Sequence, residues 1–229
     1  MKNTWRTFAA LASVGTLLLA GCGSDSGSSS TASAGGSDTE YKIGITQFVS
    51  HASLDAAREG FKDGLADAGL KVSYDEQNAQ ADQATASSIA SKFASADLDL
   101  VLAIATPTAQ ATAQVISDVP IVFTAVTDPV AADLVASNEA PGANVTGTTD
   151  MNPVAEQIDL VKQVAPDAKT VGIIYSSGEI NSAVQVDLAR QAAAAQGLEV
   201  VEKTITTTGE VLQAAQSLDV DAIYVPTDN

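Results

Sequence analysis

Small polar and acidic side chains follow short apolar runs at several places in this sequence. In "IATPTAQ" (residues 104–110), hydroxyls and backbone N–H groups at a helix start would suit a carboxylate. Asp128 or Asp228 would suit an ammonium group. A carboxylate site beside an acidic site is what an α-amino acid requires. The candidate ligand contacts are Thr46, Gln47, His51, Thr106, Thr108, Thr127, Asp128, Tyr175, Glu179, Asn181, Thr227 and Asp228; for each one, a local capping or packing role remains the alternative.

Alternating strand-like and helix-like segments would position these residues. Strands are predicted at residues 41–48, 70–76, 98–105 and 119–126, and again at 169–177, 198–205 and 221–225, with amphipathic helical patterns between them. This alternation is typical of βαβ units and predicts an α/β fold with two Rossmann-like lobes, in which helices flank parallel sheets. Ligands of such sheets bind outside the carboxyl ends of the strands, and a cleft between two lobes is a preferred site.

The second series of segments repeats the first. Ile43 and Gly69 correspond to Val171 and Gly197 at a shift of 128 residues, and Asp99 corresponds to Asp221 at a shift of 122. Any two βαβαβ units look broadly alike, but the shared glycines and "D-x-D" landmarks favour a structural duplication. "GANVTGTTD" (residues 142–150) connects the copies, and its glycines would permit hinge motion.

The first 40 residues have a different character from the rest. A basic start, an apolar run at residues 7–19 and "LAGC" predict a signal peptide over residues 1–21, and the last motif resembles a bacterial lipobox with a lipidated Cys22. Residues 22–40 are Gly/Ser-rich and predict a flexible tether. We therefore predict an exported, membrane-anchored protein with lobes at 41–145 and 151–229 and a hinge crossover at 146–150.

Composition argues against several functions. Loss of residues 1–21 would leave 9 Lys and Arg against 28 Asp and Glu, a net charge of −19, which disfavours nucleic-acid binding. One cysteine, one histidine, no phosphate-binding Gly-rich loop and no metal-ligand spacing give no basis for an enzyme, a metal site or a cofactor. A histidine triad would depend on His51 alone.

Six segments in order resemble the substrate-binding lipoproteins of ABC importers, whose better-known members take up tryptophan and tyrosine. They are "IGITQFVSHASLDAAREGF", "AIATPTAQA", "PIVFTAVTDPV", "NVTGTTDM", "VGIIYSSGEINS" and "IYVPTDN". The family pattern usually has proline at Ala52 and asparagine at Ser176. The resemblance implies the type I periplasmic-binding-protein fold, hinge closure around a small amino-acid-like solute, and a membrane permease and ATPase as partners. A ligand-sensing role at a signalling receptor, and a nucleoside or sugar as solute, stay open.

The last nine residues, "DAIYVPTDN", correspond in the repeat to "DLVLAIATPT". In the first copy a helix, another strand and the crossover follow that segment, and members of the resembled family continue well beyond it. We therefore expect the second lobe to be incomplete, with an uncovered parallel edge, and the sequence to be a fragment.

Overall fold

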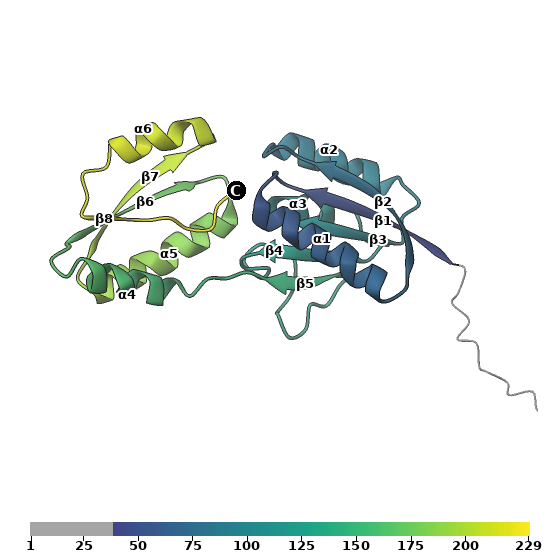
Figure 1. The fold of residues 1–229 in the computed structure, drawn as a ribbon, viewed down its shortest axis with the longest axis horizontal. Helices are drawn as coiled ribbons and strands as arrows, with labels where there is room; N and C mark the ends of the chain where they lie inside the picture. Colours follow the sequence, from purple (N-terminus) through teal and green to yellow (C-terminus); the bar gives the residue numbers. More distant parts are fainter. Residues whose placement is uncertain (1–38) are drawn as a thin grey trace, which may run out of the picture. The chain divides into compact units, whose positions relative to one another are not determined.

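The computed structural model describes residues 39–229, which form two separate parallel sheets with flanking helices (Figure 1). The predicted signal peptide, Cys22 and residues 22–38 of the predicted tether lie outside the described residues. Among the helices that are described, none has the length and apolar character needed to cross a bilayer.

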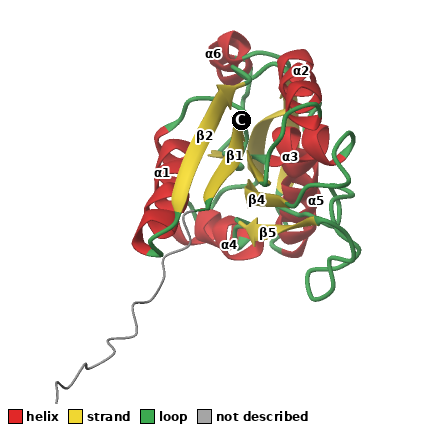
Figure 2. Cartoon of the chain, turned by 90° about the vertical axis from the view of Figure 1, so that its right-hand side faces the viewer, coloured by secondary structure: helices red, strands yellow, loops and turns green. Residues whose placement is uncertain are grey.

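The first sheet has the strand order β2-β1-β3-β4-β5, with every neighbouring pair parallel. Helix α1 lies on one face, and α2 and α3 lie on the other (Figure 2). Because both faces are covered, the central strand reads "LVLAI" without polar interruption, and its last four residues are buried. The elements are β1 (Glu40–Gln47), α1 (Ala52–Asp67), β2 (Lys71–Asn78), α2 (Gln83–Ala94), β3 (Leu100–Ile104), α3 (Thr106–Ala113), β4 (Ile121–Val126) and β5 (Val145–Thr149).

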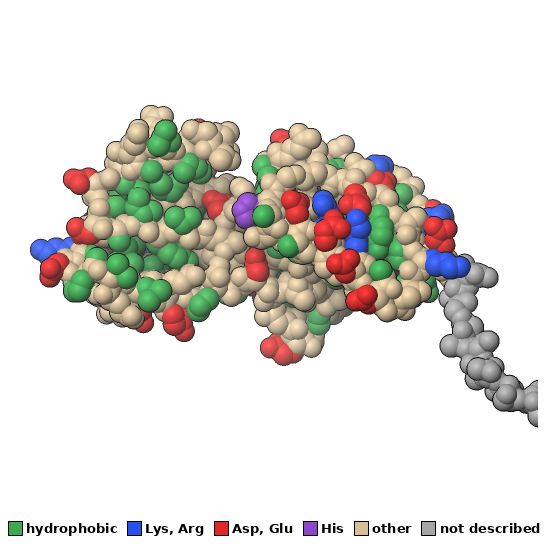
Figure 3. Space-filling model, in the orientation of Figure 1, with side chains coloured by type: hydrophobic (Ala, Val, Ile, Leu, Met, Phe, Trp, Pro, Cys, Tyr) green, Lys and Arg blue, Asp and Glu red, His purple; other side chains and the backbone are tan. Residues whose placement is uncertain are grey.

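The second sheet has the order β7-β6-β8, again parallel, with its own core around Val171, Ile173 and Tyr224. Strand β8 pairs on one side only, and Ile223 in this strand and Val225 just after it are exposed. Figure 3 shows hydrophobic side chains gathered on the visible face of the part of the molecule that carries the second sheet. The elements are α4 (Val154–Val164), β6 (Thr170–Ser176), α5 (Ile180–Ala195), β7 (Glu199–Ile205), a short 3₁₀ turn (Thr208–Glu210), α6 (Val211–Gln216) and β8 (Ala222–Tyr224).

The two sheets share details that the sequence landmarks predicted. The Asp99 carboxylate accepts a hydrogen bond of 2.8 Å from the backbone N–H of Lys42, and the Asp221 carboxylate accepts one of 2.9 Å from the N–H of Thr170. Each bond ties the start of the first strand of its unit to the start of the third. Gly69 and Gly197 end α1 and α5 with φ angles of +72° and +70°, which glycine adopts at little cost. Both units are therefore built by the same local rules.

The structure differs from expectation between the repeats. Residues 146–149, interpreted above as a hinge crossover, belong to β5, which pairs with β4 in the first sheet. Gly147 is needed there for a close approach, since a Cβ on it would lie 2.0 Å from the carbonyl oxygen of Phe123. Strand β5 ends next to Asp150, so it adds one more strand end to the edge where ligands of parallel sheets bind.

Candidate functional site

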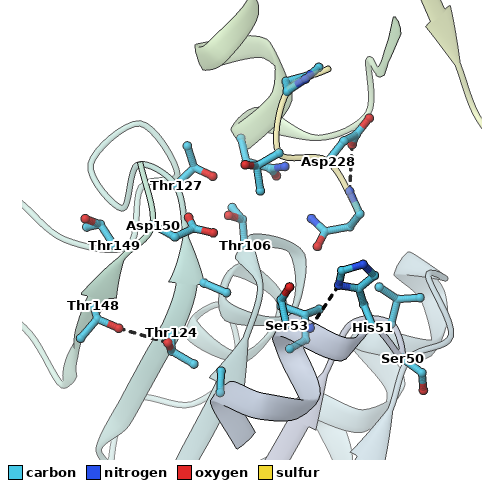
Figure 4. Close-up of a pocket in the computed structure, with 18 residues that line it drawn as sticks. Ser50, His51, Ser53, Thr106, Thr124, Thr127, Thr148, Thr149, Asp150 and Asp228 are labelled. Carbon is cyan, nitrogen blue, oxygen red and sulfur yellow. Dashed lines mark hydrogen bonds between the residues drawn. The ribbon is translucent and has the colours of Figure 1, made fainter. Parts of the chain in front are cut away.

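A cavity of about 630 Å³ lies at the carboxyl ends of the strands (Figure 4). Its walls come from segments that follow β1, β3, β4 and β5 of the first sheet and from the start of α5 and the segment after β8 in the second. This volume falls within the range of small-molecule sites, about 300–1,000 Å³. Of the residues predicted to contact ligand, those that line it are His51, Thr106, Thr127, Asn181, Thr227 and Asp228.

The start of α3 forms one part of the first-sheet wall. Thr106 is the first residue of this helix and only 1 % exposed, yet its hydroxyl has no hydrogen-bond partner. The preceding Ala105 has a φ of +84° and provides no side-chain cap. Ala125, which lines the cavity from β4, also has a positive φ, +55°. Strained backbone of this kind persists where the surroundings enforce it, and it is concentrated at ligand sites.

Asp150 is a lining residue that the sequence analysis did not select. Its Oδ1 atom is buried and has no hydrogen-bond partner. Burial raises the pKa of the Asp150 carboxyl, and the Thr127 side chain lowers it in part. Figure 4 shows Asp150, Thr127 and Thr106 on the same side of the cavity. The first-sheet wall therefore presents one carboxylate oxygen and one hydroxyl that no protein group satisfies.

The second-sheet wall is a loop held by hydrogen bonds. The Asp228 carboxylate accepts bonds from the Ser176 N–H at 2.7 Å and the Ser182 hydroxyl at 2.8 Å. Gln185, which is fully buried and was not predicted, pairs with both backbone groups of Thr227: its Nε2 donates to the carbonyl at 2.7 Å, and its Oε1 accepts from the N–H at 3.0 Å. The side chain of Asp228 thus mainly stabilises the conformation of its own loop.

Asn181 and Glu179 stand together at the start of α5. Asn181 is 3 % exposed, and its Nδ2 donates to Glu179 Oε2 at 3.2 Å while its Oδ1 has no partner. Burial raises the pKa of the Glu179 carboxyl and the negative Asp228 raises it further, whereas hydrogen bonds from Asn229 and Asn181 lower it. Glu179 lines a second cavity of about 600 Å³, which also contacts Phe48 and shares Asp228 and Asn229 with the first.

The other predicted residues lie outside the first cavity. The Thr108 hydroxyl donates to the Ile104 carbonyl at 2.7 Å, and Gln47 donates to Asp55 at 2.8 Å. Asp128 accepts bonds of 3.0 Å from two backbone N–H groups of the turn that follows it. Tyr175 donates to Glu202 at 3.0 Å, and Thr46 is buried within β1. None of these five predicted residues lines the first cavity, and their ligand contacts stay a prediction.

His51 lines the cavity from the start of α1. Its Nδ1 accepts a bond of 3.3 Å from the N–H of Ser53, so the imidazole caps the helix (Figure 4). This cap fixes the ring at the rim of the cavity. No three metal-ligating side chains come together within the described part of the chain.

This chain is similar in sequence and structure to known binding proteins. A tyrosine-binding protein of Clostridioides difficile is 46 % identical over 224 residues, which cover 94 % of this chain and 65 % of that protein. The ABC domain of a Streptococcus pneumoniae protein in complex with L-Trp is 41 % identical with a TM-score of 0.79, over 83 % of this chain and 66 % of that one. The present chain thus spans slightly less than two thirds of the length of these relatives.

Two further structures test the fold. A ligand-free, open substrate-binding protein with adhesive properties from Clostridium difficile is 51 % identical, with a TM-score of 0.60, over 82 % of this chain and 66 % of that one. A leucine-binding protein of Thermotoga maritima, at 17 % identity and a TM-score of 0.62 over 81 % of this chain and 55 % of that one, shares the fold alone. These likenesses confirm the predicted type I periplasmic-binding-protein fold. The family model for ABC transporter substrate binding proteins matches residues 42–229, and the chain belongs to that family.

Proposed function

We propose that this protein is the extracytoplasmic solute-binding component of an ABC importer and that it captures an aromatic amino acid. The solute enters the first cavity, and closure of the two lobes about the segment after β5 removes it from water. The closed form then docks on a membrane permease, which an ATPase drives. This activity is proposed by analogy with relatives of which the chain spans slightly less than two thirds.

The observation that carries this proposal is the lining of the first cavity. Both sheets contribute buried polar atoms that no protein group satisfies, and such atoms call for an external partner. Relatives at 46 % and 41 % identity are named for tyrosine and crystallised with L-Trp, respectively. A cavity of about 630 Å³ accommodates a molecule of that size.

Titration calorimetry with the twenty amino acids tests the proposal. We expect L-tyrosine or L-tryptophan to bind at least about tenfold more tightly than L-aspartate, a difference of about 1.4 kcal/mol. D-glucose and adenosine serve as controls from the two other solute classes. Binding of glucose or adenosine without any response to an amino acid would overturn the assignment.

We further propose that Cys22 carries the lipid that anchors the protein to the bacterial membrane. "LAGC" ends the apolar run, and Cys22 is the single cysteine of the sequence. Cells grown with a radiolabelled fatty acid should label the wild-type protein and leave Cys22→Ser unlabelled. The variant should also move from the membrane fraction to the soluble fraction. Labelling that persists in Cys22→Ser would contradict this anchor.

A further inference from the structure

We propose that Asp150 and Asn181 hold the ammonium group of the solute, while Thr106 and the start of α3 hold its carboxylate. This assignment rests on the proposed function and deepens it, because it states how the cavity distinguishes an α-amino acid from other aromatic solutes. It moves the ammonium contact away from Asp128 and Asp228, which the sequence alone had suggested.

The first argument is where the unsatisfied atoms lie. Among the described residues, four buried side-chain polar atoms have no hydrogen-bond partner, and three of them belong to residues that line the first cavity: Thr106 Oγ1, Asp150 Oδ1 and Asn181 Oδ1. A buried polar atom without a partner typically costs about 1–3 kcal/mol. Their concentration around one cavity indicates that a ligand supplies the missing partners.

The second argument is charge. Asp150 is desolvated, and neither lysine nor arginine occurs among the described residues that line its cavity. Asp150 as a residue is partly exposed, but its Oδ1 atom is buried, and a desolvated carboxylate oxygen is unfavourable unless a hydrogen-bond donor or a cation pairs with it. Asn181 Oδ1 is an amide oxygen and can only accept hydrogen bonds, and the same holds for Asp150 Oδ1 when the carboxyl is ionised. A ligand ammonium group supplies both the positive charge and the donors that these two atoms lack.

The third argument excludes the other carboxylates. Asp128 Oδ1 already accepts from the N–H groups of Val130 and Ala131. Both oxygens of Asp228 are engaged as well, Oδ2 by the N–H of Ser176 and Oδ1 by the hydroxyl of Ser182. Asp150 is therefore the carboxylate of the cavity with an oxygen left over for a ligand.

The fourth argument places the carboxylate of the ligand. Thr106 lies at the N-terminus of α3, where no side chain caps the helix and the helix dipole favours a negative group. Its buried hydroxyl is free to donate. Thr106 and Asp150 lie on the same side of the cavity (Figure 4). An anion site next to a cation site matches two groups that share one carbon atom.

Three ligands and two variants separate these roles. The ligands are L-tyrosine, its deaminated analogue 3-(4-hydroxyphenyl)propionate and its decarboxylated analogue tyramine; if L-tryptophan binds more tightly, indole-3-propionate and tryptamine replace the analogues. We expect Asp150→Asn to weaken the amino acid and the amine by roughly 30-fold or more and to leave the propionate unchanged. Thr106→Val should weaken the amino acid and the propionate and leave the amine unchanged.

Asp133→Asn is the matched control, because Asp133 is exposed in the loop after β4 and its φ of +57° suits asparagine. It should bind all three ligands as the wild type does. Equal losses for all three ligands in Asp150→Asn, or no loss, would overturn the assignment while amino-acid binding by the wild type leaves the proposed function standing. Thr106→Val gives an independent result if Asp150→Asn does not fold. Absence of amino-acid binding in the wild type would overturn both proposals.

Discussion

Replacing Gly147 with alanine is expected to lower the free energy of unfolding by about 3 kcal/mol or more. Gly147 in β5 lies opposite Phe123 in β4, where the register of the two strands becomes irregular. A Cβ on Gly147 would lie 2.0 Å from the carbonyl oxygen of Phe123 and 2.6 Å from its ring. The carbonyl belongs to the backbone, so a side-chain rotation cannot relieve the overlap, and β5 would have to move away from β4.

The same change should abolish tight ligand binding, because β5 leads directly into Asp150. Urea denaturation followed by circular dichroism measures the loss of stability. Gly64→Ala is the control, since Gly64 lies in α1 and its added Cβ would meet no atom within 4 Å apart from its chain neighbours and the backbone of its own helix. It should gain about 0.5–1 kcal/mol from helix propensity. An unfolding midpoint for Gly147→Ala equal to that of the wild type would refute the packing argument.

Most of the elements were predictable because they carry strong hydrophobic periodicity or near-continuous apolar runs. The segments "KIGIT" and "TVGII" are apolar because helices cover both faces of their sheets. Strand β5 lacked that signal: it reads "VTGTT", and only Val145 is buried. Helix α4 was not predicted either, although Val154, Ile158 and Val161 follow a helical spacing.

The candidate site was partly predictable by the rule that polar residues after strand ends meet at one edge. The rule brought Thr106, Thr127 and Asn181 to one cavity, and it missed Asp150 because β5 was interpreted as a connector. It also could not tell Thr106 from Thr108. Residues two apart on a helix do not share a face, so only Thr106 reaches the cavity.

The sequence could not reveal which carboxylates accept hydrogen bonds from the protein's own groups. Asp128 and Asp228 look as suitable for an ammonium group as Asp150 does. Asp128 Oδ1 accepts from the N–H groups of Val130 and Ala131 in its own turn. Asp228, in contrast, accepts from the N–H of Ser176 and the hydroxyl of Ser182, which only the folded chain brings near. The pairing between Ser176 and Asp228 spans 52 residues, so no local pattern announces it.

Replacing Gln185 is the second change from which we expect a large loss of stability and binding, because Gln185 holds the loop at residues 226–229. Its side-chain amide pairs with the N–H and the carbonyl of Thr227, as a neighbouring strand would, and its Nε2 also donates to the Asn181 carbonyl at 3.1 Å. Gln185→Leu keeps a similar volume but leaves both groups of Thr227 without these partners. The expected loss is about 2–3 kcal/mol of stability, together with weaker binding, because Thr227 and Asp228 line the cavity.

Gln185 is a positioning residue, and amide hydrogen exchange separates that role from general destabilisation. In Gln185→Leu under native conditions, the amide of Thr227 should exchange much faster than in the wild type. The amides of β1 and β3 should keep the same ranking of exchange rates as in the wild type. Gln191→Leu, at an exposed position of the same helix, should change neither exchange nor affinity. Wild-type affinity in a destabilised Gln185→Leu protein would mean that the loop does not need this anchor to bind solute. Faster exchange confined to the loop, combined with weaker binding, would show that the buried amide holds the second-sheet wall of the cavity in its binding geometry.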